Sequence, residues 1–173
     1  MEKISCFLFD FNVGDFTTEE NFRSSLGLKL DSYEKIYGVR NPNAKSPADR
    51  FSDLLKSAHE KTGLQAVVLV DEYDKPILQT FHDKELQENY RNELKAFYSV
   101  LKTQDKYIRF AFLTGVTKFG KVSVFSDLNN LMDISMDSRF ISICGITEKE
   151  LKANFKEGIA ELSDATGKTE EET

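Results

Sequence analysis

Three carboxylates follow an aliphatic run in the stretch VVLVDEYDKP, residues 67–76. A run of this kind predicts a buried strand over 66–70, with Asp71 and Glu72 directly at its carboxyl end and Asp74 shortly after them. Mg²⁺ takes oxygen ligands, and two adjacent carboxylates at a strand end can meet one ion and one water molecule. The pattern indicates metal-assisted chemistry on a phosphate, with water as the attacking group.

A polar residue also closes the next predicted strand. Segment 107–113, YIRFAFL, is rich in aromatic and branched residues and ends at Thr114. In open α/β sheets the ligand site lies beyond the carboxyl ends of the strands, so we expect Asp71, Glu72 and Thr114 at one edge. In phosphate-loop ATPases the Asp at this place helps to hold Mg²⁺, the Glu orients the attacking water, and a polar residue on the neighbouring strand senses the terminal phosphate.

An acidic pair after a strand also has a purely structural interpretation. Such residues often cap the next helix or solvate a loop, and on spacing alone this alternative stays open for Asp71 and Glu72. Pro76 fixes the loop after Asp74, and together with Thr114 it favours a built site over a solvated loop.

The sequence contains no phosphate-binding loop, which needs the motif G-x-x-x-x-G-K-[ST] so that backbone N–H groups wrap the phosphates. The one Gly-Lys-Thr lies at 167–169, but position 162 is Leu, no apolar strand precedes it, and EEET follows it. We therefore expect no phosphate site there.

Length and composition predict a single compact domain. The 173 residues, of which 40% are hydrophobic, suffice for one core over 1–163, followed by a polar, frayed tail over 164–173. A net charge of −6 argues against a dedicated surface for nucleic acid or an anionic membrane. Cys6 and Cys144 lie in hydrophobic stretches and are expected as buried thiols in a reducing compartment. The N-terminal apolar run is too short for a signal peptide or a membrane span, so we expect a cytoplasmic protein.

Strand and helix patterns alternate along the chain. Strands are expected at 4–11, 66–70, 107–113 and 139–146, and the first of them, being apolar almost throughout, is expected to be covered on both faces. Helices are expected at 18–37, from Pro47 after the N-cap Ser46 to Gly63, at 84–102, near 126–132, and from Thr147 to about 163. Capping boxes, Thr17 with Glu20 and Thr147 with Glu150, begin the first and last of these helices. The alternation predicts a three-layer α/β fold with a mostly parallel sheet.

Three longer stretches carry a family resemblance. The runs VVLVDEYDKPIL, FAFLTGVTKFGKVSVFSDLNNLMDIS and RFISICGITEKEL closely resemble the AAA-ATPase-like family of P-loop NTPases that is abundant in anaerobic gut bacteria. Members typically carry a phosphate-loop segment at the N-terminus, and many end in a nuclease-like domain of the PD-(D/E)XK class. Because the likeness begins at ISCFLFDFN and includes neither region, the sequence resembles an internal piece of such a protein, with a P-loop NTPase sheet that lacks its first strand and phosphate loop.

The resemblance implies a role for each candidate residue. Asp71 would be the carboxylate associated with Mg²⁺, with Asp74 in support, Glu72 would orient the attacking water, and Thr114 would sense the terminal phosphate. Lys118 could approach the phosphates from the loop that follows, although exposed loop lysines are usually only solvated. The implied cofactors are Mg²⁺ and ATP, and ATP would be the partner of the full-length protein.

Three functions are therefore compared. The first is the Walker B and sensor part of an ATP-hydrolysing module, inactive alone because most affinity for a triphosphate comes from the amides and Lys of the phosphate loop. The second is a non-catalytic α/β module that binds a protein partner. The third is an independent Mg²⁺-dependent phosphohydrolase or nuclease that uses the three carboxylates. A sheet without its first strand also predicts an exposed apolar edge, and self-association that covers it.

Overall fold

The computed structural model describes residues 4–116, 123–126, 128–140, 142–143 and 145–169. It divides into two compact units, Met1–Leu131 and Met132–Thr173, and each is considered by itself. No helix in these described ranges is both long enough and apolar enough to cross a membrane. The expected single domain over 1–163 stays a prediction.

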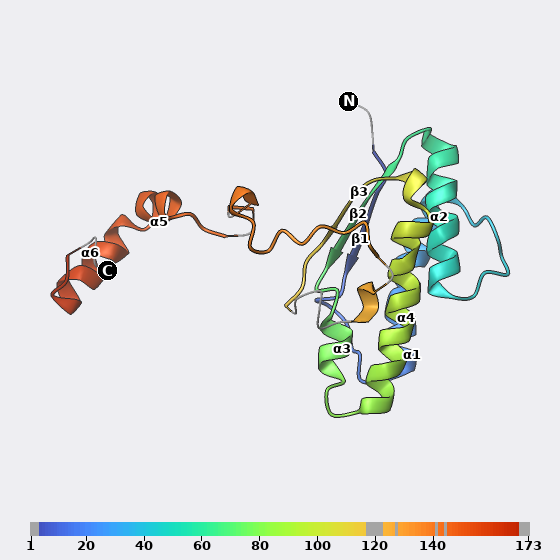
Figure 1. Cartoon of the computed structure of the whole chain (residues 1–173), viewed down its shortest axis with the longest axis horizontal. Coiled ribbons are helices and arrows are strands. Elements are labelled where there is room, and N and C mark those ends of the chain that lie inside the picture. Colours follow the sequence, from blue (N-terminus) through green and yellow to red (C-terminus); the bar gives the residue numbers. More distant parts are fainter. Residues whose placement is uncertain (1–3, 117–122, 127, 141, 144, 170–173) are drawn as a thin grey trace. The chain divides into compact units, whose positions relative to one another are not determined.

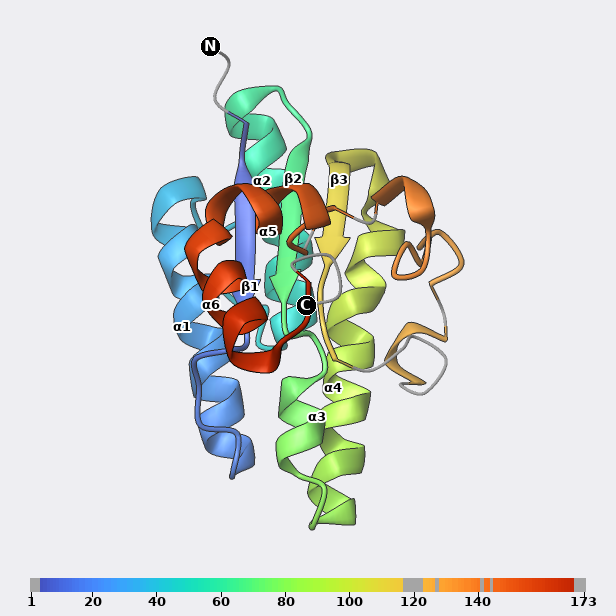
Figure 2. The same ribbon diagram turned by 90° about the vertical axis from the view of Figure 1, so that its left-hand side faces the viewer.

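A parallel sheet is the centre of the first unit. Its strands are β1 (Cys6–Asp10), β2 (Ala66–Asp71) and β3 (Ile108–Leu113), in the order β1-β2-β3. Both pairs are parallel, so all three strands end at the same edge (Figure 2). The predicted α/β class and the parallel sheet are confirmed, and over the described residues both β1 and β3 are edge strands.

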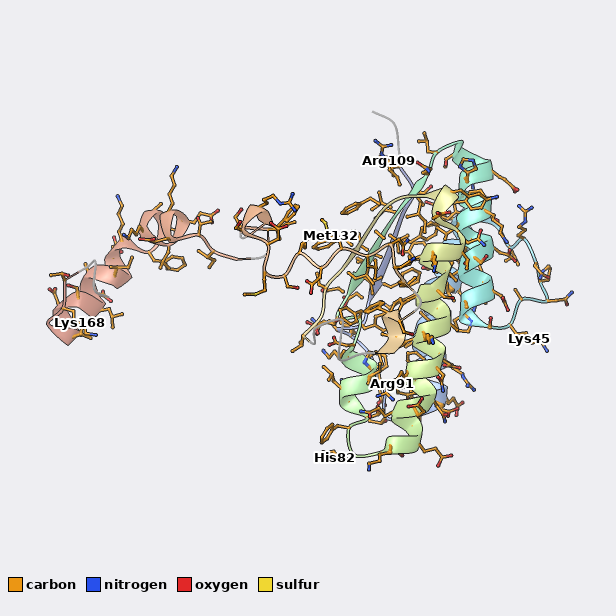
Figure 3. The ribbon with its side chains drawn as sticks, viewed as in Figure 1. Lys45, His82, Arg91, Arg109, Met132 and Lys168 are labelled. Carbon is orange, nitrogen blue, oxygen red and sulfur yellow. The ribbon has the colours of Figure 1, made fainter. Side chains whose placement is uncertain are left out.

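Three long helices cover one face of this sheet. They are α1 (Glu19–Tyr37), α2 (Pro47–Thr62) and α4 (Lys84–Thr103), and all three lie on the same side of the strands (Figure 1). Side chains fill the space between the sheet and these helices (Figure 3). The ring of Phe9 lies 4.9 Å from those of Phe51 and Phe97, measured between centroids. This aromatic packing binds β1, α2 and α4 into one core.

The predicted helix ends are confirmed where the signals are local. Ser46 caps α2 by accepting from the Asp49 N–H, and Gly63 ends that helix in the left-handed conformation. For α1 the predicted cap Thr17 is wrong, because Thr18 is the N-cap and accepts from the Asn21 N–H. The Asp15 carboxylate accepts from both the N–H and the hydroxyl of Thr17, and these bonds hold Thr17 outside the helix.

Within the described part of the first unit, the opposite face of the sheet is open. Exposure alternates along β1, where Phe9 is 0% exposed and Leu8 is 48% exposed, and Phe110 of β3 is 53% exposed. The first unit by itself therefore has two layers where three were predicted, and within this unit segment 4–11 is covered on one face and not on both. Cys6 lies on the open face and is exposed, which corrects its prediction as a buried thiol, whereas Cys144 lies outside the described residues.

The second unit contains two short helices, α5 (Glu148–Asn154) and α6 (Lys156–Thr166). The capping box of Thr147 and Glu150 is confirmed, but the single helix predicted to run to about 163 is broken at Phe155. The Asn154 side chain donates to the Glu150 carbonyl at 2.9 Å, in competition with the helical backbone.

Two further predictions for the region 123–146 are wrong. The helix expected near 126–132 is replaced by a 3₁₀ turn, η3, at Ser123–Phe125. The strand expected at 139–146 is replaced by another 3₁₀ turn, η4, at Ser138–Phe140, and no described residue after it is in a strand. The Asp137 carboxylate accepts from the Arg139 N–H at 3.0 Å and also bonds its guanidinium, and this local turn overrides the apolar pattern.

The difference between the two faces of β1 can be measured. Phe9→Ala is expected to lower the free energy of unfolding by about 3–5 kcal/mol, because it empties a fully buried ring site. Leu8→Ala, one position along on the open face, is expected to cost less than about 1 kcal/mol because half of that side chain is already in water. Urea unfolding followed by circular dichroism measures both values. An equal loss from the two substitutions would mean that the face bearing Leu8 is covered in solution.

Candidate functional site

The open face of the sheet carries three rows of side chains that run across the strands. Alternate residues of a strand face the same side, and the parallel register aligns them between strands. The first row consists of Cys6, Val67 and Phe110. The second consists of Leu8, Leu69 and Phe112. The third row, at the carboxyl edge, is polar and consists of Asp10, Asp71 and Thr114. An apolar surface therefore ends in an acidic border.

Asp71 and Thr114 meet within this border. Thr114 Oγ1 donates a hydrogen bond to Asp71 Oδ1. The backbone supports the contact, because the Thr114 N–H donates to the Val70 carbonyl at 2.8 Å and the Tyr73 N–H donates to the Thr114 carbonyl at 2.9 Å. Asp71 is exposed at this edge. The predicted meeting of these two residues at one edge is confirmed.

Glu72 lies next to Asp71 in an unusual backbone conformation. Its φ is +55°, and over the described part of the chain it is the one residue other than glycine with a positive φ. A side chain in this left-handed region costs roughly 1–2 kcal/mol, and such residues concentrate at functional sites. The chain bends here at the end of β2, and Glu72 is half-buried whereas Asp71 is exposed.

Asp74 differs from the other two acids because it is 0% exposed. It is the N-cap residue of the short helix α3 (Lys75–Gln79), yet its side chain makes no capping hydrogen bond there. Instead Asp74 Oδ1 accepts from the N–H of Val116, beyond the end of β3, at 3.3 Å. The interpretation of these acids as simple helix caps therefore does not describe Asp74.

A lysine that the sequence reasoning missed joins the ends of β1 and β2. Lys75 Nζ donates to the Asn12 carbonyl at 3.0 Å and to Asn12 Oδ1 at 2.6 Å. The Asn12 N–H in turn donates to Asp10 Oδ1 at 2.6 Å. These bonds hold Asp10 at the border beside Asp71, its register partner. No spacing in the sequence signals the pair, because Asn12 and Lys75 are brought together only by strand order.

Tyr98 of α4 supports the acidic turn from the core side. Its hydroxyl donates to the Tyr73 carbonyl at 3.0 Å. Burial raises the pKa of the Tyr98 phenol well above its usual value, and the negative charge of Asp74 raises that pKa further. The phenol therefore stays protonated and remains a donor to the turn.

Two other candidates from the sequence are placed differently. Lys118 lies outside the described residues. Gly167 of the Gly-Lys-Thr run is the left-handed C-cap of α6, with φ of +67°, and its N–H donates to the Ser163 carbonyl. A phosphate loop leads into a helix N-terminus, whereas this glycine ends a helix. The expectation of no phosphate site there stays a prediction.

The oxygen atoms of Asp71 and Thr114 at the acidic border suit a metal ion whose other ligands are water and substrate phosphates. Among the described residues, no three or more His, Cys, Asp or Glu side chains are grouped to hold an ion. Mg²⁺ is usually bound by one or two carboxylates together with waters and substrate phosphates, without a complete protein cage. One exposed carboxylate, Asp71, beside the hydroxyl of Thr114 fits that arrangement.

Comparison with known proteins agrees with this geometry. The family model described as Predicted AAA-ATPase matches residues 2–125, a range that includes Asp71, Glu72 and Thr114. A relative from Azotobacter chroococcum mcd 1, described as "Uncharacterized protein in vnfD 5'region", is 42% identical over 145 residues. That alignment covers 84% of this chain and 28% of the relative, so the chain spans little more than a quarter of its length. No solved structure matches. Because the family model matches well over half of the chain and the relative is this similar, the chain belongs to the Predicted AAA-ATPase family.

Proposed function

We propose that this chain supplies the Walker B and sensor part of an ATP-hydrolysing module. Asp71 would hold the Mg²⁺ that accompanies ATP, Glu72 would orient the attacking water, and Thr114 would contact the terminal phosphate. The observation that carries the proposal is the hydrogen bond between Thr114 and Asp71 at the carboxyl edge of a parallel sheet. Family membership supports the same assignment.

The proposed step makes distinct demands on the three side chains. Glu72 would accept a proton from the water that attacks the terminal phosphorus, while the bond from that phosphorus to the oxygen of the leaving ADP breaks. Asp71 would help to hold the Mg²⁺ that accompanies ATP and that supplies positive charge against the negative phosphates. Thr114 has one hydroxyl proton, which Asp71 accepts in this structure. Contact with a phosphate would therefore require Thr114 to exchange one acceptor for the other. Occupancy of the site would thus be coupled to the bond between Thr114 and Asp71.

The carboxylates alone would attract a triphosphate poorly. Asp10, Asp71 and Glu72 are three acidic residues close together, and the sequence has no phosphate-binding motif to offset them. The two apolar rows of the open face lie directly beside the acidic border. We propose that a phosphate-binding segment outside this sequence covers these rows and ends next to Asp71.

Binding of Mg-ATP to this chain alone tests whether phosphate affinity depends on a separate phosphate-binding segment. Isothermal titration calorimetry is expected to give a Kd weaker than about 1 mM, because the loop amides and lysine that hold the phosphates are missing from the sequence. Asp71→Asn serves as the control for metal-dependent binding. Micromolar binding that Asp71→Asn abolishes would mean that the chain holds a complete nucleotide site.

The role of Glu72 can be tested in a family member that also contains a phosphate loop. Glu72→Gln at the equivalent position is expected to lower kcat by about 10²–10⁴ with little change in KM for ATP, because binding survives and water activation is lost. Phosphate release measures both constants. Glu85→Gln, at an exposed position in the first turn of α4, is the matched control and should leave both unchanged. A normal kcat in Glu72→Gln would contradict the proposed role.

The exposed apolar rows also favour the second candidate, a module that binds another protein. Leu8 and Phe110 each leave about half of their surface in water on adjoining rows of one face. An apolar surface that is contiguous in this way usually marks an interaction site. A scaffold role would need this face and not the acidic border, so Asp71→Asn and Glu72→Gln would leave such binding intact.

Self-association is the simplest form of that behaviour. The chain is expected to form dimers or larger species over a concentration series in sedimentation velocity, because a second copy can cover the apolar rows. Phe110→Ser should shift the distribution toward monomer. Leu28→Ser, at an exposed apolar position on α1, is the matched control and should not. A monomer at every concentration would exclude this form of the second candidate.

A further inference from the structure

Asp74, which is fully buried, joins the segment after β3 to the acidic turn at residues 71–74. Asp74 Oδ1 accepts from the Val116 N–H at 3.3 Å, while the Asp74 backbone carbonyl accepts from Ile77 and Leu78 at 3.0 Å. One residue therefore joins the start of α3 to the chain leaving β3.

Gly115 lies between the two ends of this contact and leaves no room for a side chain. A Cβ at Gly115 would lie 2.5 Å from Tyr73 Cε1 and 2.7 Å from Asp74 Oδ1. Its φ is not among the positive values of the described glycines, so glycine is needed here for space and not for backbone conformation. The backbone after Thr114 therefore lies directly against the acidic turn.

Tyr73, which the backbone at Gly115 contacts, is held in place by residues of the core. The Tyr73 carbonyl accepts from the buried Tyr98 hydroxyl at 3.0 Å, and the Tyr73 ring packs edge-on against Phe125 with centroids 4.8 Å apart. Tyr98 and Phe125 also pack against each other, at 5.3 Å. Tyr73, against which Gly115 packs, is therefore held in place by contacts with α4 and with η3, which lies after β3 in the chain.

We propose that Asp74 and Gly115 are positioning residues that hold Thr114 within hydrogen-bond reach of Asp71. Thr114 follows the last residue of β3. The close approach of Gly115 to Tyr73 and Asp74, together with the hydrogen bond from the Val116 N–H to Asp74, restricts rotation of the backbone after Thr114. In this proposal Asp74 acts through the backbone after β3, and its expected role as a supporting metal ligand stays a prediction. The consequence for catalysis rests on the proposed function, but the positioning itself does not.

Amide hydrogen exchange of the whole chain, measured by NMR without nucleotide, tests this proposal. Asp74→Ala removes the acceptor of the Val116 N–H, and Gly115→Ala adds a methyl group that would clash with Tyr73 and Asp74. Each should speed exchange of the Tyr73 and Thr114 amides by about ten-fold or more. The Phe11 and Val67 amides, which bond across β1 and β2, should keep their rates. Asp74→Asn keeps an acceptor oxygen and should behave like the unmodified chain.

The control for adding a methyl group is Gly27→Ala inside α1, where the nearest atom lies 3.8 Å away, and it should leave all four amides unchanged. A uniform acceleration at all four amides in Asp74→Ala and Gly115→Ala would show general destabilisation and overturn the proposal. Unchanged rates at Tyr73 and Thr114, or the same selective loss in Asp74→Asn, would also overturn it.

A catalytic readout separates this proposal from the proposed function. In a family member with a phosphate loop, Asp74→Ala should lower kcat while KM for ATP stays within a few-fold, and Asp74→Asn should restore kcat. If the exchange pattern holds but Glu72→Gln leaves hydrolysis intact, the proposed function fails and the positioning role stands. If Glu72→Gln abolishes hydrolysis but exchange at Thr114 is unaffected by Asp74→Ala, the positioning role fails alone.

Discussion

The parallel register of β2 with its two neighbours is the constraint on which the candidate site depends. It brings three strand ends to one edge and sorts their side chains into aligned rows, so that Asp10, Asp71 and Thr114 share a border. An antiparallel neighbour would place a strand beginning beside Asp71, and the hydroxyl of Thr114 would lie elsewhere. The parallel direction of the strands is therefore the condition that brings these side chains together at one edge.

The same register is held from both sides of β2. Lys75 bonds to Asn12 and fixes the exit of β1, and Asp74 bonds to the backbone of Val116 and fixes the exit of β3. Two adjacent residues, Asp74 and Lys75, thus bond to the segments that follow β3 and β1, on either side of β2. The turn that follows Asp71 is therefore bonded to both neighbouring segments, which suits a carboxylate that must meet an ion in a fixed geometry.

The features that could be predicted from the sequence were those encoded locally. Ser46, Pro47 and Gly63 bound α2 as expected, since cap residues act on their own helix ends. Thr17 was mistaken for a cap because Asp15 competes for its donors, and segment 139–146 was mistaken for a strand because the turn at Asp137 outweighs an apolar pattern. The site divides in the same way. Asp71, Glu72 and Thr114 are visible as strand ends, whereas the contacts of Asp74 and Lys75 join segments far apart in the chain and need the strand order.

The backbone of Glu72 implies a conflict between folding and function at one position. With φ at +55°, glycine would fit this turn with less strain than glutamate, so Glu72→Gly could make the chain more stable while removing the carboxylate. Screening variants for thermal stability would then select against the proposed activity at this residue. The turn is a place where the more stable protein and the more active one differ by a single side chain.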